Sequence, residues 1–201
     1  MQTNPDGLSQ LTGIILAGGK NRRIGTNKAF LVVNGTRIID RTVGIFKDIF
    51  AEVIIVTNEP LAYLDQNITI VTDILPDKGA LGGLYTGLFF AHHSRAFVCA
   101  CDMPFIDKKF IEYMISQAGS YDIVVPDAGD GLQPMHAIYS KKFLVEIKTL
   151  LEQDKLKIAC MYKNSRTLII YSDTIDTFPP GKKMFLNVNT YDDLQMIAKE
   201  V

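Results

Sequence analysis

The stretch GIILAGGKNRRIGTNK, residues 13–28, contains the two features from which the fold and the functional site are predicted. Its first part, Gly13–Ala17, is apolar and mostly branched, which is typical of a strand that is buried on both faces of a parallel sheet. Gly18 and Gly19 end this run. Four basic residues follow: Lys20, Arg22, Arg23 and Lys28. The pattern predicts a buried strand that leads into a basic, glycine-rich loop.

A loop of this composition suits the binding of a phosphate chain. Glycines allow backbone N–H groups to approach phosphate oxygens closely, and lysine and arginine side chains neutralise the charge of a triphosphate. The spacing fits neither the Walker A motif nor the dinucleotide-binding fingerprint. A solvated basic turn is the alternative interpretation, but the position of the loop directly after a buried strand favours a phosphate site.

Strand-like apolar runs alternate with helix-like patterns along the whole chain. The predicted strands are Gly13–Ala17, Val53–Val56, Ile68–Val71, Ala96–Cys101, Asp122–Val125, Met135–Tyr139 and Thr167–Tyr171. The predicted helices are Thr36–Phe50, Leu81–His93, Lys108–Ala118, Ser140–Gln153 and Tyr191–Lys199. This alternation predicts a single-domain, Rossmann-like α/β fold, in which a mostly parallel sheet forms the middle of three α/β/α layers. Residues 1–10 are predicted to be a flexible tail, residues 11–201 the domain, and Thr177–Lys183 a surface loop.

Composition and charge exclude several classes of function. With 201 residues, 47% of them hydrophobic, the chain suits one globular domain. A net charge of −1 argues against broad binding to nucleic acid or to an anionic membrane. Three cysteines do not indicate a disulfide framework, and the N-terminus lacks the features of a signal peptide. The longest stretch without a charged residue, Gly79–Ser94, is too short to span a membrane. A cytoplasmic protein is therefore predicted.

Polar residues and glycines directly follow four of the predicted strands. They are Gly18 and Gly19, Thr57 and Asn58, Asp73, and Asp102. In sheets of this class, ligands bind beyond the carboxyl ends of the strands. Asp102 is a candidate ligand of Mg²⁺, because this ion takes one or two protein carboxylates and shares its other positions with phosphate and water. A helix N-cap is the alternative role for this residue.

Other patterns are weaker and leave their alternatives open. Asp73 is followed by GALGGL, residues 79–84, so the acid is a candidate contact to a ribose hydroxyl or a base edge, and Gly82 and Gly83 are candidates to let a flat base lie close to the backbone. A turn cap and helix packing explain the same residues equally well. His136 is a candidate acid, base or ligand, but a lone histidine entering a strand is more often structural.

The segment NVNT, residues 187–190, contains two asparagines on one face of an extended chain. Asn187 and Asn189 are candidates to reach a substrate or a metal-bound water. Thr190 and Asp193 also fit the start of a helix.

The stretch LAGGKNRRIGTNKAFL, residues 16–31, resembles the signature loop LAGG-x-x-x-R-M-G-x-x-K-x-x-L of the molybdenum cofactor guanylyltransferases (MobA-type), with Ile24 in place of methionine. CDMPF, QPMHAIY and NVNTYDDL resemble further segments of this family in the same order, so the resemblance covers residues 11–200. It implies a nucleotide-diphospho-sugar transferase-like fold. It also implies an enzyme that transfers GMP from GTP to the terminal phosphate of molybdopterin and releases pyrophosphate.

The resemblance also implies roles for individual residues. The residues it places in the GTP site are Leu16, Ala17, Gly18, Gly19, Lys28, Asn58, Asp73, Gly83 and Asp102. Asp102 matches the ligand of the Mg²⁺ cofactor, and Lys28, Asp102 and Arg22 are the predicted catalytic residues. The implied partners are GTP, molybdopterin or the molybdenum cofactor, and other cofactor-biosynthesis proteins or apo-molybdoenzymes, with no nucleic acid and no membrane.

Two alternatives remain at this point. One is another nucleotidyltransferase of the same fold, which uses CTP on molybdopterin or acts on a sugar phosphate or polyol phosphate. The other is a GTP-binding module without catalysis. Similar cytidylyl- and uridylyltransferases tend to have LAAG where this chain has LAGG, and the missing β-carbon at Gly18 is a hypothesis for how a purine is accommodated.

Overall fold

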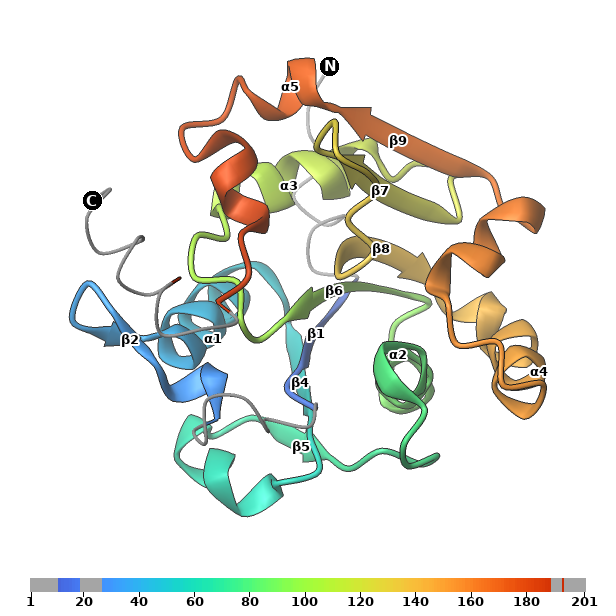
Figure 1. Cartoon of the computed structure of the whole chain (residues 1–201), viewed down its shortest axis with the longest axis horizontal. Helices are drawn as coiled ribbons and strands as arrows, with labels where there is room; N and C mark the ends of the chain where they lie inside the picture. The colour runs from blue at the N-terminus through green and yellow to red at the C-terminus, as the bar shows by residue number, and fades with distance from the viewer. Residues whose placement is uncertain (1–10, 19–26, 189–192, 194–201) are drawn as a thin grey trace.

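The computed structural model describes residues 11–18, 27–188 and 193, and within them a seven-stranded sheet runs through the middle of the molecule (Figure 1). In spatial order its strands are β5 (Thr69–Val71), β4 (Glu52–Val56), β1 (Thr12–Leu16), β6 (Arg95–Ala100), β8 (His136–Ser140), β7 (Ile123–Asp127) and β9 (Thr167–Tyr171). Only β8 runs against its neighbours in this sheet, being antiparallel to β6 and β7. The predicted mostly parallel sheet is confirmed.

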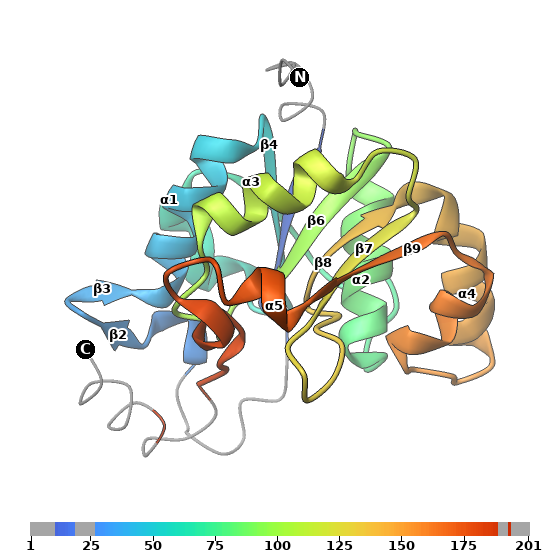
Figure 2. The same ribbon diagram turned by 90° about the horizontal axis from the view of Figure 1, so that it is seen from above.

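Helices cover both faces of the sheet (Figure 2). On one face lie α1 (Ile38–Ile49) and α3 (Lys108–Gln117), and on the other α2 (Gly79–Phe90) and α4 (Leu144–Glu152). Successive residues of a strand point to opposite faces. Ile15 of β1 therefore packs in the core under α1 and α3, while Ile14 packs under α2 and α4. Two cores on one sheet explain why the strands carry apolar residues on both faces, and they confirm the three-layer α/β/α arrangement.

The remaining described elements are short. They comprise the two-stranded sheet of β2 (Val32–Val33) and β3 (Thr36–Arg37), the helix α5 (Ser172–Ile175), and 3₁₀ turns at Lys28–Phe30, Pro60–Gln66, Lys141–Phe143, Ile158–Asn164 and Gly181–Phe185. None of the helices in the described part of the chain is long and apolar enough to cross a bilayer.

The helix predicted at Thr36–Phe50 begins two residues later than expected. Asn34 and Gly35 have φ angles of 52° and 78°, which is the backbone of a two-residue hairpin turn. This turn pairs Val33 with Thr36, so the first residues of the predicted helix belong to β3. The Asn-Gly pair was the signal in the sequence for this hairpin.

Other predicted boundaries also shift. The helix predicted at Leu81–His93 runs from Gly79 to Phe90, and Ser140–Gln153 divides into a 3₁₀ turn and α4. The predicted loop Thr177–Lys183 ends in a 3₁₀ turn, because Met184 and Phe185 are buried in the core beside α3. The predicted tail of residues 1–10 and the predicted helix Tyr191–Lys199 lie outside the described residues, except for Asp193.

Candidate active site

A cavity of about 750 Å³ lies at the carboxyl ends of β5, β4, β1 and β6. Its lining consists of Leu16, Ala17, Gly18, Asn27, Lys28, Val56, Asn58, Glu59, Asp73, Asp77, Gly79, Ala80, Gly83, Ala100, Cys101, Asp102 and Met135. A volume of this size suits a small-molecule ligand. The described residues of the predicted GTP site all belong to this lining, whereas Gly19 and Arg22 lie outside the described part of the chain.

The end of β1 forms the centre of the cavity wall. The N–H of Ala17 donates to the carbonyl of Val56, and the carbonyl of Leu16 accepts from the N–H of Cys101 at 3.1 Å. The sheet hydrogen bonds thus continue past the strand end on both sides. They place the start of the glycine-rich loop between the residues that follow β4 and those that follow β6.

Lys28 and Asp102 meet at the cavity although they come from distant parts of the sequence. Lys28 begins the 3₁₀ turn before β2, and Asp102 follows β6. The Nζ atom of Lys28 lies 3.7 Å from Oδ2 of Asp102, and each side chain is about one-fifth exposed. A cation and a carboxylate at this distance, both reached from the cavity, suit a ligand that brings both phosphates and a metal ion.

The charge of Asp102 is only partly compensated by its surroundings. Burial raises the pKa of its carboxyl, and the positive charge of Lys28 counteracts only part of this increase. The alternative role as a helix cap is excluded, because the carboxylate that caps α3 is that of Asp107, which accepts the N–H of Phe110 at 2.8 Å. Asp102 is therefore a hard oxygen donor that a further cation would stabilise.

The donor set around Asp102 fits Mg²⁺ of the kind shared with a substrate. Among the described residues, no group of three or more histidine, cysteine or acidic side chains is arranged to hold a metal ion. A magnesium ion in a phosphate-binding site does not need such a group, since one or two carboxylates, phosphate oxygens and water complete its shell. Asp102 alone meets that requirement.

Asp73 presents an unused acceptor at the same cavity. Asn58 donates from Nδ2 to Oδ2 of Asp73 at 3.1 Å, while Oδ1 is buried and has no hydrogen-bond partner among the described residues. Burial raises the pKa of this carboxyl. Buried polar atoms are normally paired, so this oxygen is a candidate to accept an N–H or O–H from a ligand. The next backbone N–H, of Ile74, is satisfied by Thr86 rather than by Asp73.

Two glycines keep the space around Asp73 open. A β-carbon at Gly18 would lie 3.7 Å from Oδ2 of Asp73, and one at Gly83 would lie 3.8 Å from Oδ1. At Gly83 it would also lie 3.4 Å from the side chain of Leu16. The contact with Leu16 is ordinary van der Waals contact, so close packing of α2 on β1 does not require a glycine at this position, and the absence of a side chain at Gly83 leaves space beside Asp73.

Several lining residues were not predicted from the sequence. Asn27 precedes Lys28, and its preference for N-cap positions was the available signal. Glu59 follows Asn58 directly, but nothing in the sequence distinguishes it as a site residue. Cys101 lies on the cavity wall and Cys99 in the core.

His136 is a structural residue and does not line the cavity. It is fully buried on β8, and both ring nitrogens lack hydrogen-bond partners in the described part of the structure. Its ring centroid lies 5.0 Å from that of Phe97, 5.9 Å from Phe110 and 5.2 Å from Phe185. Burial lowers the pKa of His136 to about 3. The sequence alternatives of acid, base and ligand are therefore set aside.

We expect His136→Phe to reduce the loss of stability in mild acid. The pKa of His136 is about 3 in the folded chain and about 6.5 in an unfolded chain. Between these values the unfolded state binds more protons than the folded state. The free energy of unfolding therefore decreases as the pH is lowered, by up to about 1.4 kcal/mol per pH unit. Phenylalanine removes this proton uptake. Urea unfolding of both proteins at pH 7.0, 6.0 and 5.0 measures the difference in slope, and parallel pH dependences would contradict the prediction.

The segment that contains Asn187 approaches the site from the C-terminal part of the chain. The N–H of Val188 donates a hydrogen bond to the carbonyl of Asp102, the candidate metal ligand, at 2.9 Å. Asn187 directly precedes Val188 in the sequence. The Asn187 side chain is exposed. Asn189 and Thr190 lie outside the described residues, so the predicted helix start is not observed.

Comparison with known proteins confirms the resemblance that was seen in the sequence. The model of the MobA-like NTP transferase domain matches residues 13–167. A molybdenum cofactor guanylyltransferase of Desulfosudis oleivorans is 36% identical over 190 residues, which cover 94% of each chain.

Two solved structures share the fold at lower identity. Molybdopterin-guanine dinucleotide biosynthesis protein A from Archaeoglobus fulgidus superposes with a TM-score of 0.80 at 22% identity, over 94% of this chain and 98% of that one. Rv0371c of Mycobacterium tuberculosis, in complex with manganese, superposes with a TM-score of 0.68 at 20% identity, over 96% of this chain and all of that one. With its sheet, its cavity and a near full-length relative at 36% identity, the chain belongs to the family of MobA-like NTP transferase domains, nucleotidyltransferases that include the molybdenum cofactor guanylyltransferases.

Proposed function

We propose that this protein transfers GMP from GTP to the terminal phosphate of molybdopterin and releases pyrophosphate. The observation that carries the proposal is the 36% identity to a molybdenum cofactor guanylyltransferase over nearly the whole of both chains. The meeting of Lys28 with Asp102 in the lining of one cavity provides the chemistry that such a transfer requires.

The reaction is a displacement at phosphorus. An oxygen of the molybdopterin phosphate attacks the α-phosphorus of GTP, a new P–O bond forms, and the bond to the β-phosphate breaks in line with it. Catalysis of such transfers relies on positioning and on the neutralisation of charge. A phosphate nucleophile is already ionised near pH 7, so no general base is needed, which agrees with the burial of His136 away from the cavity.

Lys28 and Asp102 have complementary roles in this proposal. The ammonium group of Lys28 stabilises the charge that develops on the departing pyrophosphate. Asp102 holds a divalent cation, Mg²⁺, which would stabilise charge on the phosphates once it is bound. The support for the assignment of Asp102 is its under-compensated charge and its position 3.7 Å from Lys28.

Asp73 and Asn58 bind the nucleoside part of GTP in this proposal. Oδ1 of Asp73, which has no partner in the described part of the chain, accepts a hydrogen bond from a ribose hydroxyl or a base N–H, while Asn58 holds the other carboxylate oxygen. Gly18 and Gly83 leave the space beside this carboxylate for the purine.

We also place the reaction in the cytoplasm, which is supported by the three free cysteines.

Incubation with Mg²⁺, GTP and molybdenum-loaded molybdopterin, followed by mass analysis, tests the proposal. The expected product is heavier than the acceptor by one GMP unit, with one pyrophosphate released per product. Parallel reactions contain CTP, UTP or ATP. Preferred incorporation of CMP would identify a cytidylyltransferase instead, and binding of GTP without release of pyrophosphate in the presence of the acceptor would identify a module without catalysis.

A further inference from the structure

Side chains hold the turn that carries Lys28 in place. This turn, Asn27–Phe30, is called the Lys28 turn. The Asn27 side chain accepts the N–H of Ala29 at 3.1 Å and thereby caps the 3₁₀ helix. The same side chain donates from Nδ2 to the hydroxyl of Tyr63 at 2.9 Å and to Oε2 of Glu59 at 3.1 Å. The residue directly before Lys28 is therefore bonded to the segment that follows β4.

Tyr63 packs against the Lys28 turn. It is fully buried in the 3₁₀ turn Pro60–Gln66, and its ring centroid is 4.9 Å from that of Phe30. Its hydroxyl accepts a hydrogen bond from the side chain of Asn27. One buried hydroxyl thus links the Lys28 turn to the segment that follows β4.

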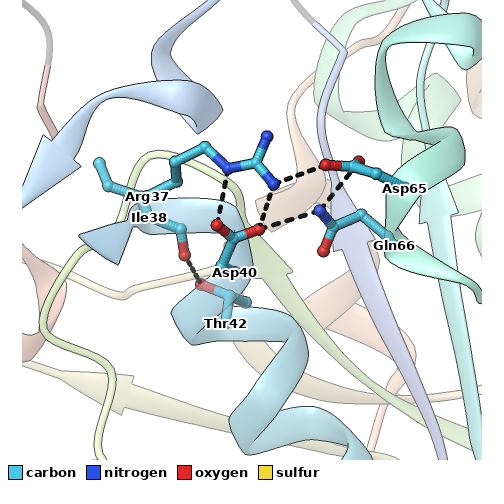
Figure 3. A network of polar contacts seen from close by, with 6 residues as sticks. All are labelled: Arg37, Ile38, Asp40, Thr42, Asp65 and Gln66. Atoms are coloured by element: carbon cyan, nitrogen blue, oxygen red, sulfur yellow. Dashed lines mark hydrogen bonds and ion pairs between the residues drawn. The ribbon is translucent and has the colours of Figure 1, made fainter. Parts of the chain in front are cut away.

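Arg37 takes part in a network of polar contacts with Asp40 and Asp65 (Figure 3). Its guanidinium donates to both carboxylate oxygens of Asp40, at 2.6 and 2.8 Å, and to Asp65 at 2.6 Å. Gln66 donates to the same two carboxylates, at 2.9 and 3.1 Å. These contacts join the start of α1 to the Pro60–Gln66 turn that contains Tyr63.

Arg37 also contacts the Lys28 turn directly. Its guanidinium carbon lies 5.5 Å from the centroid of the Phe30 ring, within the range of a cation–π contact. Individual exposed ion pairs contribute little, but bidentate geometry and a shared network raise their contribution. The ring of Phe30, which belongs to the Lys28 turn, is therefore in contact with both Tyr63 and Arg37.

We propose that Tyr63, supported by Arg37, is a positioning residue that holds the ammonium group of Lys28 at the phosphate side of the cavity. Lysine has a long side chain, so the position of its Nζ depends on where its backbone turn is held. Small displacements of a charged group at a reacting phosphate reduce rates strongly. The inference rests on the proposed contact of Lys28 with the phosphates of GTP, and neither Tyr63 nor Arg37 touches the ligand itself.

The experiment measures GTP affinity by calorimetry with Mg²⁺ in four proteins: wild type, Tyr63→Phe, Lys28→Ala and the double variant. Tyr63→Phe keeps the ring against Phe30 and deletes only the hydroxyl. We expect it to weaken GTP binding about 5- to 10-fold, the effect of one lost hydrogen bond, and to leave guanosine binding unchanged. In the Lys28→Ala background the same substitution should have no further effect, because its consequence passes through Lys28.

A purely structural role of Tyr63 gives a different result. In that case the substitution weakens GTP and guanosine alike, or weakens GTP equally in both backgrounds, and either outcome overturns the inference. No change in GTP affinity overturns it as well. The matched control is Tyr139→Phe, which deletes another buried hydroxyl, one that donates to the carbonyl of Pro134 at 2.7 Å. This control should bind GTP as the wild type does.

A second variant keeps the inference testable if Tyr63→Phe does not fold. The side chain of Arg37 is 35% exposed, so Arg37→Gln leaves the core intact. We expect it to weaken GTP binding about threefold in the wild-type background, as for one modest interaction, and not at all in Lys28→Ala. If Lys28→Ala itself does not weaken GTP binding, the proposed role of Lys28 is contradicted. If Lys28→Ala weakens GTP binding as expected, but the Tyr63 and Arg37 variants have the same effect with and without Lys28, only the inference about Tyr63 and Arg37 is contradicted.

Discussion

Replacement of Asp102 by asparagine is expected to lower kcat at least about 100-fold, because the amide cannot supply the charge that is proposed to hold a metal ion at the phosphates. The amide has nearly the same shape as the carboxylate. Burial disfavours the charged form of Asp102, so removal of the charge should leave the free energy of unfolding unchanged or higher. Release of pyrophosphate measures kcat, and urea unfolding measures stability.

Asp107→Asn is the matched control for this prediction. Asp107 lies five positions further along the chain and outside the cavity, where its carboxylate caps α3. Asparagine is also a favourable N-cap, so this variant should retain both activity and stability. Turnover close to that of the wild type in Asp102→Asn would show that the metal ion is held elsewhere.

Lys28→Ala is expected to weaken GTP far more than guanosine. The ammonium group lies on the cavity wall beside Asp102, where the phosphates of a bound nucleotide are proposed to lie. A charge-assisted hydrogen bond contributes about 1.5–3 kcal/mol, so its loss should weaken GTP binding about 10- to 100-fold. Guanosine has no phosphate, and its affinity should change by less than about threefold.

Calorimetry with each ligand in the presence of Mg²⁺ measures this difference. Lys108→Ala provides the control, since Lys108 lies at the start of α3, pairs with Asp48 at 3.0 Å and does not line the cavity. It should bind both ligands as the wild type does. Equal weakening of GTP and guanosine in Lys28→Ala would mean that Lys28 does not contact phosphate.

The strands of the fold were predictable because each of them is recognisable from its own residues. The runs GIILA and VIIV are apolar throughout, and this pattern indicates strands with both faces buried. Element ends were less predictable, because they depend on single turns. The Asn34–Gly35 turn removes two residues from α1, and α2 begins at Gly79, before the first apolar residue of its pattern.

The candidate site was predictable in its parts but not in its arrangement. The positions that follow β1, β4, β5 and β6 were recognised from the sequence, since the carboxyl ends of parallel strands lie at one edge of a sheet. The supporting residues were not recognised. Tyr63 is a single aromatic residue in a short turn, and its role follows only from its contacts with Asn27 and Phe30.

The sequence by itself determined the class of the fold, the basic glycine-rich loop and the acid that follows β6, because hydrophobic periodicity and motif spacing are properties of neighbouring residues. Only the tertiary structure decided that Lys28 lies 3.7 Å from Asp102, that Oδ1 of Asp73 has no hydrogen-bond partner among the described residues, and that His136 is enclosed by aromatic rings. The physical reason is that the order of strands in a sheet depends on which buried faces pack together. Apolar strands of similar composition do not encode the strand order locally. The strand order is what brings residues from distant segments into contact.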